Sequence, residues 1–368
     1  MREELPADER VEFWRRRRDL TSSHRCDDYT EGEPHDSVQE IAAALRIDVP
    51  LLMGRDPQPQ PLDVSDPIGE NLDRVREFLE RSDAMGPGPG TAVPSLAAIT
   101  MMLRDAWQAY RHAEYDTLMA ALPRLLRGAA VSDRSRVGGP EGAEASRLLS
   151  QAYQVTAAAL RKLGEYHLSW LTADRAIEAA GRGRDRLLAA TAARFVSAAL
   201  LAIGRPAAAF NLTMAVTRAF PEGGGPDPVI GGSLLLQSAA AAARMGDTAA
   251  TRGLLSSAGA VATRLGCDAD RYWTRFGPTA VELSRASAAV DLGDGGQAIS
   301  VHHRLPPSRL DDLPREQHAG HYLTLARAYL QVGGIGRAAR ALDTSTRIAP
   351  GEAHSPLHQA IRLQIRTA

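Results

Sequence analysis

Glycines that recur at nearly constant spacing constrain the fold of this chain more than any other feature. Each of them ends one Ala- and Leu-rich segment with helical periodicity and precedes another such segment. Successive spacings are 40, 42, 47 and 40 residues for Gly164, Gly204, Gly246, Gly293 and Gly333. A period in this range, with two helices in each unit, is typical of an α-solenoid, in which helix pairs stack on their neighbours. We therefore expect inter-helix turns at these glycines.

The segments between these glycines carry no signal for β-structure. Val, Ile and Thr never form the alternating runs that strands require, whereas apolar residues recur at helical spacing to the C-terminus. A further helix pair is expected around Ala106–Leu126. The sequence therefore predicts an all-α fold, with the helical array over residues 96–368.

The last unit, "HYLTLARAYLQVGGIGRAARALDTSTRIAP", resembles the tetratricopeptide pattern, and the middle units match it more loosely. Small residues stand where paired helices approach, bulky residues fill the gap, and glycine and proline mark the turn and the end. In chain order these residues are Ala326, Tyr329, Gly333, Ala338, Leu342 and Pro350. The resemblance implies a tetratricopeptide-like α-solenoid.

The sequence of residues 55–95 predicts a linker, rich in Pro and Gly, that contains one short helix. "GRDPQPQPLDVSDP" and "GPGPGTAVPS" interrupt helical periodicity on either side of "IGENLDRVREFLERSDAM". Within that helix, Leu72, Val75, Phe78 and Leu79 share one face.

Residues 1–54 form a small head. "VEFWRRRRDL" and "DSVQEIAAALRIDVPLLMG" resemble the first and last helices of the Cro/repressor-type helix-turn-helix domain, the group called XRE. That family places a recognition helix in the major groove between these two pieces. The intervening "SSHRCDDYTEGEPH" is roughly a dozen residues too short for the two missing helices and has no amphipathic repeat. The head is therefore an incomplete or degenerate helix-turn-helix.

Four consecutive arginines, Arg15, Arg16, Arg17 and Arg18, are the candidate DNA-binding residues. Arginine suits phosphate contacts, but consecutive helical residues point in different directions, so only about two can face one surface. Three interpretations stay open: a solvated helix end that packs Phe13 and Trp14 inward, direct DNA contact, or contact with another anionic partner.

The head and the array together resemble actinobacterial regulators that combine an XRE domain with a C-terminal tetratricopeptide-like array. "RYWTRFGPTAVEL" is the most specific match, because members typically carry "YW…FGPTN" between array units, and Ala280 replaces their asparagine. The stretch "LLSQAYQVTAAALRKLGEYHLSWLTADRAI" is also similar to theirs. The resemblance implies a regulator whose array senses a ligand or holds a partner.

Polar residues on the first helices of the units are the candidate ligand or partner groove. Counting back from the turn glycines selects Gln151, Gln154, Arg161, Thr191, Arg194, Ser233 and Arg244. The concave surface of a solenoid binds peptides or small ligands, but a solvated helix face would look similar. Position 280 falls on the same track.

Three aromatic residues, Tyr272, Trp273 and Phe276, lie just ahead of Pro278, which suits the first turn of a helix. They are either a loop anchor that fills the gap in the longest unit or an aromatic wall for a ligand. In the second case Arg275 is a candidate anion clamp.

Enzyme and metal signatures are absent from the sequence. It has no P-loop, no dinucleotide fingerprint and no nucleophile framed by a base. His318 and His321 are i, i+3, but no Cys or carboxylate set completes a metal site, and we expect these histidines, like His302 and His303, at the surface. The sequence predicts neither a cofactor nor a metal.

The net charge and the cysteine content indicate which compartment and which partners to expect. The formal net charge of −1 gives no overall attraction to nucleic acid or membranes, and two cysteines form no disulfide framework. No apolar run is long enough to span a bilayer. We expect a cytoplasmic, non-enzymatic regulator that binds a peptide, a small molecule or a protein, with DNA contact limited by the incomplete head. The alternative is an interaction scaffold that has lost DNA binding. The oligomeric state stays open, a homodimer included.

Overall fold

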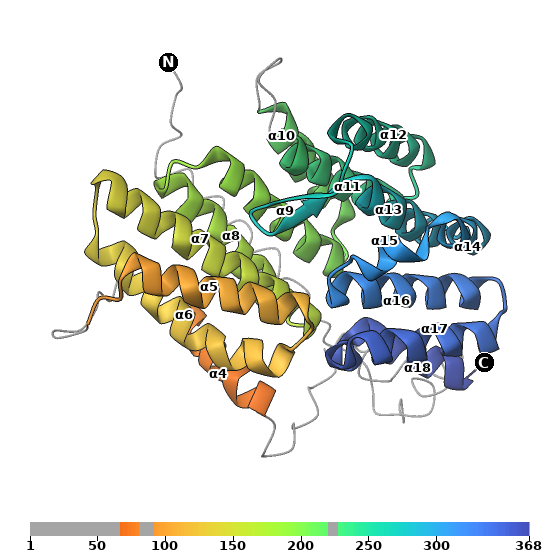
Figure 1. Cartoon of the computed structure of the whole chain (residues 1–368), viewed down its shortest axis with the longest axis horizontal. Coiled ribbons are helices and arrows are strands. Elements are labelled where there is room, and N and C mark those ends of the chain that lie inside the picture. The colour runs from red at the N-terminus through yellow and green to blue at the C-terminus, as the bar shows by residue number, and fades with distance from the viewer. Residues whose placement is uncertain (1–66, 81–91, 220–226, 368) are drawn as a thin grey trace, which may run out of the picture. The chain divides into compact units, whose positions relative to one another are not determined.

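The computed structural model describes residues 67–80, 92–219 and 227–367. All described residues belong to one compact unit, within residues 65–368. The expected helix-turn-helix-like head, with Arg15, Arg16, Arg17 and Arg18, lies outside the described residues. In the described part of the chain nearly all regular structure is helical, which confirms the all-α prediction (Figure 1). No helix there is long and apolar enough to cross a membrane.

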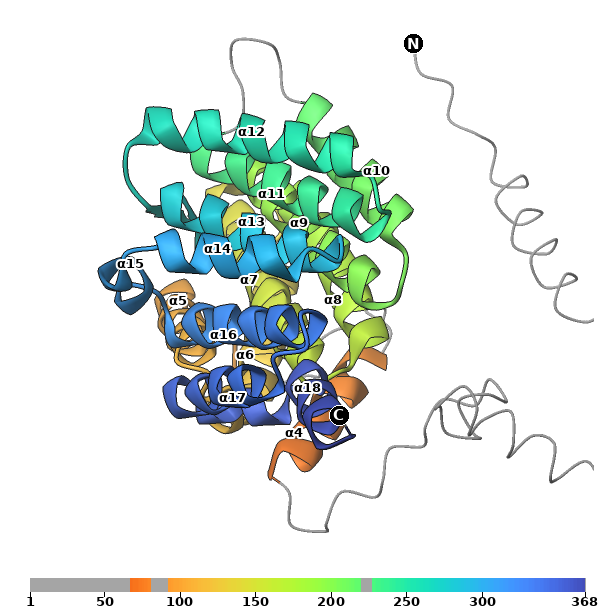
Figure 2. The same ribbon diagram turned by 90° about the vertical axis from the view of Figure 1, so that its right-hand side faces the viewer.

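Most helices follow one another as consecutive pairs. The first helices are α5 (Leu96–Arg111), α7 (Gly139–Lys162), α9 (Arg186–Ala202), α11 (Pro228–Arg244), α13 (Pro278–Asp291) and α16 (Arg315–Gln331). Their partners are α6 (Tyr115–Ser135), α8 (Tyr166–Arg182), α10 (Pro206–Arg218), α12 (Thr248–Leu265), α14 (Gly295–Arg304) and α17 (Ile335–Ile348). The remaining elements of the C-terminal half are α15 (Pro307–Asp311), the 3-10 helix η1 (Pro350–His354) and α18 (Pro356–Thr367). Figure 2 shows the later pairs stacked in chain order, from α11–α12 through α13–α14 to α16–α17.

One turn geometry recurs between paired helices. All five predicted glycines have positive φ, between 72° and 86°, and lie at the expected helix ends. After the glycine, the next backbone N–H donates to a carbonyl five residues earlier, as from Glu165 to Leu160 (2.9 Å) and from Asp294 to Ala289 (2.8 Å). This hydrogen bond is that of the Schellman motif, which requires a left-handed residue. The five predicted turns are therefore confirmed.

Two more turns have the same hydrogen bond without a glycine at the left-handed position. Ala113 (φ 57°) lies between α5 and α6, and Arg184 (φ 53°) lies between α8 and α9. The backbone N–H groups of Glu114 and Asp185 donate to Ala109 (2.9 Å) and Ala180 (3.1 Å). A search for glycines cannot find these turns, because the surrounding helices impose the left-handed conformation on ordinary residues.

Small residues allow paired helices to approach closely. Serine hydroxyls donate to backbone carbonyls of the partner helix: Ser169 of α8 to Ala157 of α7 (2.7 Å), and Ser345 of α17 to Ala319 of α16 (3.0 Å). In the last pair Ala326 and Ala338 are fully buried. These positions agree with the small residues expected from the tetratricopeptide pattern.

Helix α4 (Pro67–Glu80), which the sequence placed in a linker, packs against α6. Leu72, Val75 and Leu79 are buried and Phe78 packs beside them, so the predicted apolar face is confirmed. The helix belongs to the core of the array, because removing such a strip of apolar side chains from water is favourable.

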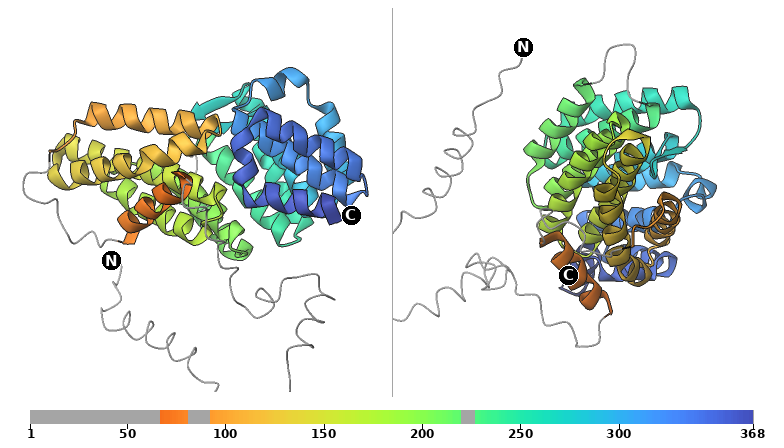
Figure 3. Two further views of the ribbon diagram at one scale, coloured as in Figure 1. Left: turned by 90° about the horizontal axis from the view of Figure 1, so that it is seen from below. Right: turned by 90° about the vertical axis from the view of Figure 1, so that its left-hand side faces the viewer.

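The first and last pairs of the array contact each other. Helix α16 packs against α5 (Figures 1 and 3). Gly351 lies so close to the α5–α6 turn that a Cβ atom on it would be 2.0 Å from the carbonyl oxygen of Ala113. A Cβ atom on Gly164, in the α7–α8 turn, would be 2.9 Å from Pro356. In an open solenoid each repeat contacts only its neighbours, so these contacts are an addition to the expected arrangement.

A short antiparallel hairpin interrupts the helices between α12 and α13. Strand β1 (Ala269–Arg271) pairs with β2 (Thr274–Phe276), with Arg271 opposite Thr274. The expectation of a chain without strands is corrected here. Strands of three residues are too short to produce an alternating pattern, so no periodic signal marks them in the sequence.

Candidate functional site

An open cavity of about 830 Å³ lies against the first helices of five successive pairs. Each of these helices contributes a charged side chain to its lining: Arg161 from α7, Arg194 from α9, Arg244 from α11, Asp291 from α13 and Arg327 from α16. Glu352 of η1 and residues of α18 complete the wall. We call it the arginine cavity. Its volume is in the range of small-molecule sites in proteins.

A buried ionic cluster lies beside the arginine cavity. Lys162 Nζ is 2.6 Å from Glu316 Oε1 and 2.8 Å from Glu352 Oε1. The phenol of Tyr110 donates to Glu316 (3.4 Å), and the phenol of Tyr115 donates to Glu352. The cluster therefore connects α5, α6 and α7 to α16 and η1, which are distant in the sequence.

The environment fixes the protonation states in this cluster. Burial lowers the pKa of Lys162, but Glu316 and Glu352 raise it by more, so the net shift is upward. Burial raises the pKa of Glu316, but Lys162, Arg161 and the hydrogen bond from Tyr110 together lower it by more, so the net shift is downward. Burial, followed by the charge of Glu316, raises the pKa of Tyr110 to about 12. At neutral pH the three groups are an ammonium, a carboxylate and a neutral phenol.

A second ionic group faces the arginine cavity from α11, α13 and α16. Arg244 Nε lies 2.9 Å from Asp291 Oδ2, and Arg327 Nη2 lies 2.9 Å from Asp291 Oδ1. The carboxylate of Asp291 is nearly inaccessible to solvent, whereas both arginines are partly exposed. One buried carboxylate thus balances only one of the two guanidinium charges.

Arg161 and Arg194 form no ion pair with any described residue. The Nε atom of Arg194 is buried without a hydrogen-bond partner in the described chain, and its Nη2 makes only a long contact, 3.4 Å, to Thr274 Oγ1. Burial lowers the pKa of Arg194 to about 10, and the nearby Arg161 adds to this effect. Arg161 differs: burial lowers its pKa, but Tyr110 and Glu316 raise it, and the net shift is upward. Arg194 is therefore the less compensated cation of the two.

The structure brings together three of the predicted groove residues, Arg161, Arg194 and Arg244. The others do not line this cavity. Gln154 is buried and donates to Ser150 (3.2 Å), the Thr191 and Ser233 hydroxyls donate to carbonyls within their own helices, and Gln151 is half-buried on α7. Counting back from a turn finds the correct side of a helix. It does not separate side chains that reach the cavity from those that end in the helix–helix contact.

Sequence reasoning missed Lys162, Asp291, Arg327 and Glu352 in the cavity wall. A signal existed for Asp291, which precedes Gly293 by the same two residues that separate Arg244 from Gly246. Arg327 lies on the first helix of the last unit, where the same counting was applicable. No sequence pattern points to Glu352, because it enters the wall from η1 after the last pair.

The aromatic residues ahead of Pro278 lie on the hairpin and contact first helices. The ring of Trp273 stacks on Trp107 of α5 with centroids 6.0 Å apart, and Arg111 lies 5.0 Å over it. Phe276 is fully buried against Gly232 of α11. The Tyr272 hydroxyl donates to Asp185 at the start of α9 (2.6 Å). These contacts support the loop-anchor interpretation over the ligand wall, and Pro278 begins α13 as expected.

The guanidinium of Arg275, the candidate anion clamp, is bonded to other residues of the chain. Its Nη1 donates to the backbone carbonyl of Asp312 (2.9 Å), and its Nη2 is 3.6 Å from Asp268. The guanidinium therefore holds the hairpin to the segment that follows α15.

Of the four histidines expected at the surface, His303 is exposed, His302 and His318 are half-buried, and His321 departs most from the expectation. His321 is buried on α16, and its Nε2 lies 3.0 Å from Nδ1 of the half-buried His302 on α14. Burial, followed by His302 and His318, lowers the pKa of His321 to about 3. Within the described ranges no group of three or more His, Cys, Asp or Glu side chains could hold a metal ion.

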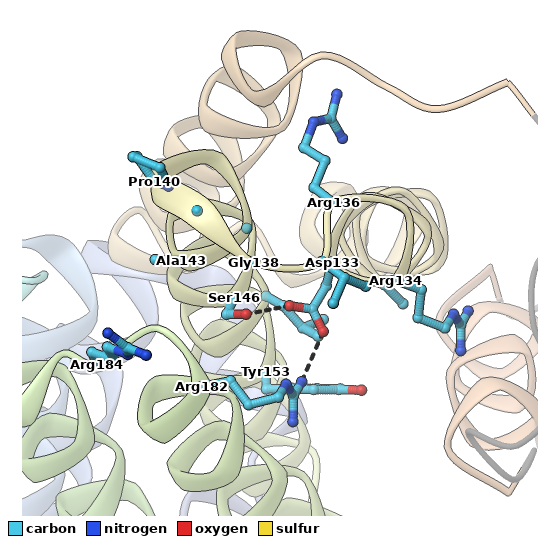
Figure 4. Close-up of a pocket in the computed structure, with 15 residues that line it drawn as sticks. Asp133, Arg134, Arg136, Gly138, Pro140, Ala143, Ser146, Tyr153, Arg182 and Arg184 are labelled. Atoms are coloured by element: carbon cyan, nitrogen blue, oxygen red, sulfur yellow. Dashed lines mark hydrogen bonds and ion pairs between the residues drawn. The ribbon is translucent and has the colours of Figure 1, made fainter.

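A second cavity, of about 800 Å³, lies between the α6–α7 connection and the α8–α9 turn (Figure 4). The carboxylate of Asp133 accepts a hydrogen bond from Ser146 and forms an ion pair with Arg182 at 2.9 Å. Arg136 donates to the carbonyl oxygen of Pro94 (3.0 Å) and lies 3.7 Å from Glu141. Asp133, Arg136 and Arg182 are thus paired within the chain, and Arg184, which has no ion pair with a described residue, is exposed, so the arginine cavity is the stronger candidate site.

No model of a known protein family matches this chain, and no curated protein matches it.

Proposed function

We propose that this protein is a non-enzymatic regulator whose helical array binds a ligand in the arginine cavity. One observation carries the proposal: a single cavity receives a charged side chain from the first helix of each of five successive pairs. A tetratricopeptide-like solenoid binds its ligands on the surface formed by its first helices. The resemblance to actinobacterial XRE regulators, made by "RYWTRFGPTAVEL" and the head, is the second support.

A short chain of contacts would link a ligand in the arginine cavity to much of the array. The cavity wall includes Glu352, whose partner Lys162 also contacts Glu316, next to Tyr110 of the first pair. A ligand that contacts several pairs at once favours one arrangement of them over others, and it shifts the population by its differential affinity. The array is then the sensor, and residues 1–54 are the output.

For DNA we expect at most weak, salt-sensitive and sequence-independent binding, because the sequence between the two helix-turn-helix-like pieces of the head is too short for the family's recognition helix. The measurement is a gel-shift titration of the full chain against the DNA upstream of its own gene. Nanomolar binding that survives about 200 mM salt and discriminates single base changes would contradict this expectation.

The ligand-binding part is tested by denaturing the purified chain and identifying released molecules by mass spectrometry. A compound retained at a stoichiometric amount by the parent, and lost from Arg194→Met, supports a sensor. Absence of any such compound, together with a protein partner that binds parent and Arg194→Met equally, would favour the alternative of an interaction scaffold.

A further inference from the structure

We propose that the arginine cavity takes a small organic molecule carrying a phosphate monoester, whose dianionic group lies at Arg194. This inference rests on the proposed function, because it names the ligand class of the same site. It follows from the charge balance of the wall, from the unused donors of one arginine and from the apolar surface beside it.

The charge balance of the wall is positive. Five cationic side chains line the cavity, and three carboxylates face or adjoin them, so two positive charges remain. The cationic residues are Arg161, Lys162, Arg194, Arg244 and Arg327, and the carboxylates are Asp291, Glu316 and Glu352. A phosphate monoester carries close to two negative charges at neutral pH, so it would neutralise this excess.

The two remaining charges belong to different parts of the wall. The positive charges of Lys162 and Arg161 are balanced by the carboxylates of Glu316 and Glu352. Both carboxylates contact the Lys162 ammonium, and both also raise the pKa of the nearby Arg161. Arg194 has no carboxylate partner in the described chain, and Asp291 leaves one charge of Arg244 and Arg327 uncompensated. A guanidinium presents several N–H donors in a planar fork that matches phosphate oxygens.

A buried charge without a partner is costly to a folded protein, and it is retained where a ligand supplies the partner. Arg194 is such a group within the described chain: its Nε is buried without a hydrogen-bond partner, its hydrogen bond to Thr274 is long, and its guanidinium otherwise lies over the Phe195 ring at 4.5 Å. Lys162 and Asp291 have close partners within the chain, and Arg161, which forms no ion pair with a described residue, is compensated by the nearby Glu316 and Glu352. This contrast singles out Arg194 as the anion-binding residue.

The ligand needs an organic part as well as a phosphate. The cavity volume of about 830 Å³ far exceeds that of a phosphate ion, and Leu201, Leu323 and Leu357 line it together with several alanines. Gln237, Ser287 and Ser355 offer neutral hydrogen-bonding groups in the same wall. A small molecule with an apolar body and a few hydroxyl or amide groups fits this surface.

The proposal is tested on the full chain by calorimetric titration and thermal melting at constant ionic strength. The probes are inorganic phosphate, phenyl phosphate, glycerol phosphate, succinate and phenol, with sodium chloride as the reference. The variants are Arg194→Met, Arg327→Gln and the control Arg264→Gln, which removes an exposed arginine from α12, away from the cavity.

We expect phenyl phosphate or glycerol phosphate to bind the parent and Arg264→Gln equally, and more tightly than inorganic phosphate. Arg194→Met should weaken this binding at least tenfold, roughly the contribution of one charge-assisted contact. Without ligand, Arg194→Met should melt about 2 to 4 °C above the parent, because it removes an unpaired buried charge. If Arg194→Met does not fold, Arg327→Gln carries the test, since it leaves Asp291 paired with Arg244 and removes one positive charge.

Phosphate esters that stabilise the parent, Arg194→Met and Arg327→Gln alike would overturn the proposal, as would tighter binding of succinate or phenol. No binding of any phosphate ester would overturn it as well. If a neutral or cationic compound co-purifies with the parent and is lost from Arg194→Met, the ligand class is wrong but the sensor proposal stands. Arginine-dependent phosphate binding that leaves every partner and DNA interaction unchanged would leave the ligand class standing and remove the regulatory function.

Discussion

At the scale of single residues, Trp273 combines favourable packing with an unfavourable backbone conformation. It and Tyr272 form the two-residue hairpin loop with φ of 61° and 48°. Loops of this kind favour asparagine and glycine, because side chains with a Cβ are strained at positive φ. The stacking of Trp273 on Trp107 offsets that strain.

Replacing Trp273 separates the two contributions. We expect Trp273→Ala to lower the free energy of unfolding by about 2 to 4 kcal/mol, because the packing is lost and the strain stays. Trp273→Gly should lower it by about 1 kcal/mol less, because glycine relieves the strain. Denaturant titrations of the parent and both variants measure this difference. Melting of both variants at the parent's temperature would show that the hairpin does not anchor the array.

Because of His321, we expect the folded chain to lose stability in mild acid. Its pKa is about 3 in the folded chain, against 6.5 for an ordinary histidine, so the unfolded chain binds a proton that the folded chain excludes. Stability contributed by the neutral imidazole is complete above about pH 6.5 and declines as the pH falls toward 3. The neighbouring His302 and His318, whose pKa values are also lowered, act in the same direction.

Melting temperatures between pH 7.5 and 5 test this expectation. The variant His321→Gln, which keeps a polar side chain but cannot titrate, should show a shallower decline than the parent. Equal slopes for the two proteins would mean that His321 does not control the acid response.

At the scale of elements, the inter-helix turns differ in their tolerance of insertion. A Cβ atom on Gly246 would meet no atom within 4 Å, whereas one on Gly164 would meet Pro356 of α18. We expect a short Gly-Ser insertion after Gly246 to lower the melting temperature least, one after Gly164 to lower it more, and one within "AAALRKL" of α7 to lower it most. Thermal melts give the ranking. Equal losses at Gly246 and within α7 would contradict the assignment of the turn.

A substitution at Gly232 tests how the hairpin packs on α11. A Cβ atom at this position would lie 2.1 Å from the Phe276 ring, which is fully buried. Gly232→Ala should therefore destabilise the chain by about 1 to 3 kcal/mol, in spite of the higher helix propensity of alanine. The matched change Gly253→Ala, in α12 with no atom within 4 Å, should be neutral or stabilising. Denaturant melts that rank the two variants in the opposite order would exclude this packing.

At the scale of the whole array, Lys162 links the first pairs to the last. Removing its ammonium leaves Glu316 and Glu352 buried and facing each other's charge. We expect Lys162→Met to cost about 3 to 5 kcal/mol, and the triple change with Glu316→Gln and Glu352→Gln to recover part of that loss. Chemical denaturation measures both, and hydrogen exchange of α5 and α16 shows whether the contact between them opens. A single variant as stable as the parent would show that the cluster does not hold the ends together.

Several features of the site were predictable because they depend on local sequence. The turn glycines were found because Schellman turns favour a residue without a Cβ, and Arg161, Arg194 and Arg244 followed from their positions before those turns. Pro278 as a helix start also followed from local chemistry. The turns at Ala113 and Arg184 were missed because packing, and not residue type, fixes their backbone.

The sequence by itself determined the helical class, the helix ends that carry a turn glycine and the side of each helix that faces its neighbours, because these depend on interactions over a few residues. Only the tertiary structure decided that α16 meets α5, that Glu352 reaches Lys162, and that His321 is buried beside His302. It also decided that Arg194 has no carboxylate partner among the described residues, while Arg244 and Arg327 share Asp291. Such contacts join residues far apart in the chain, and they depend on how successive pairs are rotated. Small changes in helix packing, accumulated over six pairs, set that rotation, and no local pattern encodes the sum.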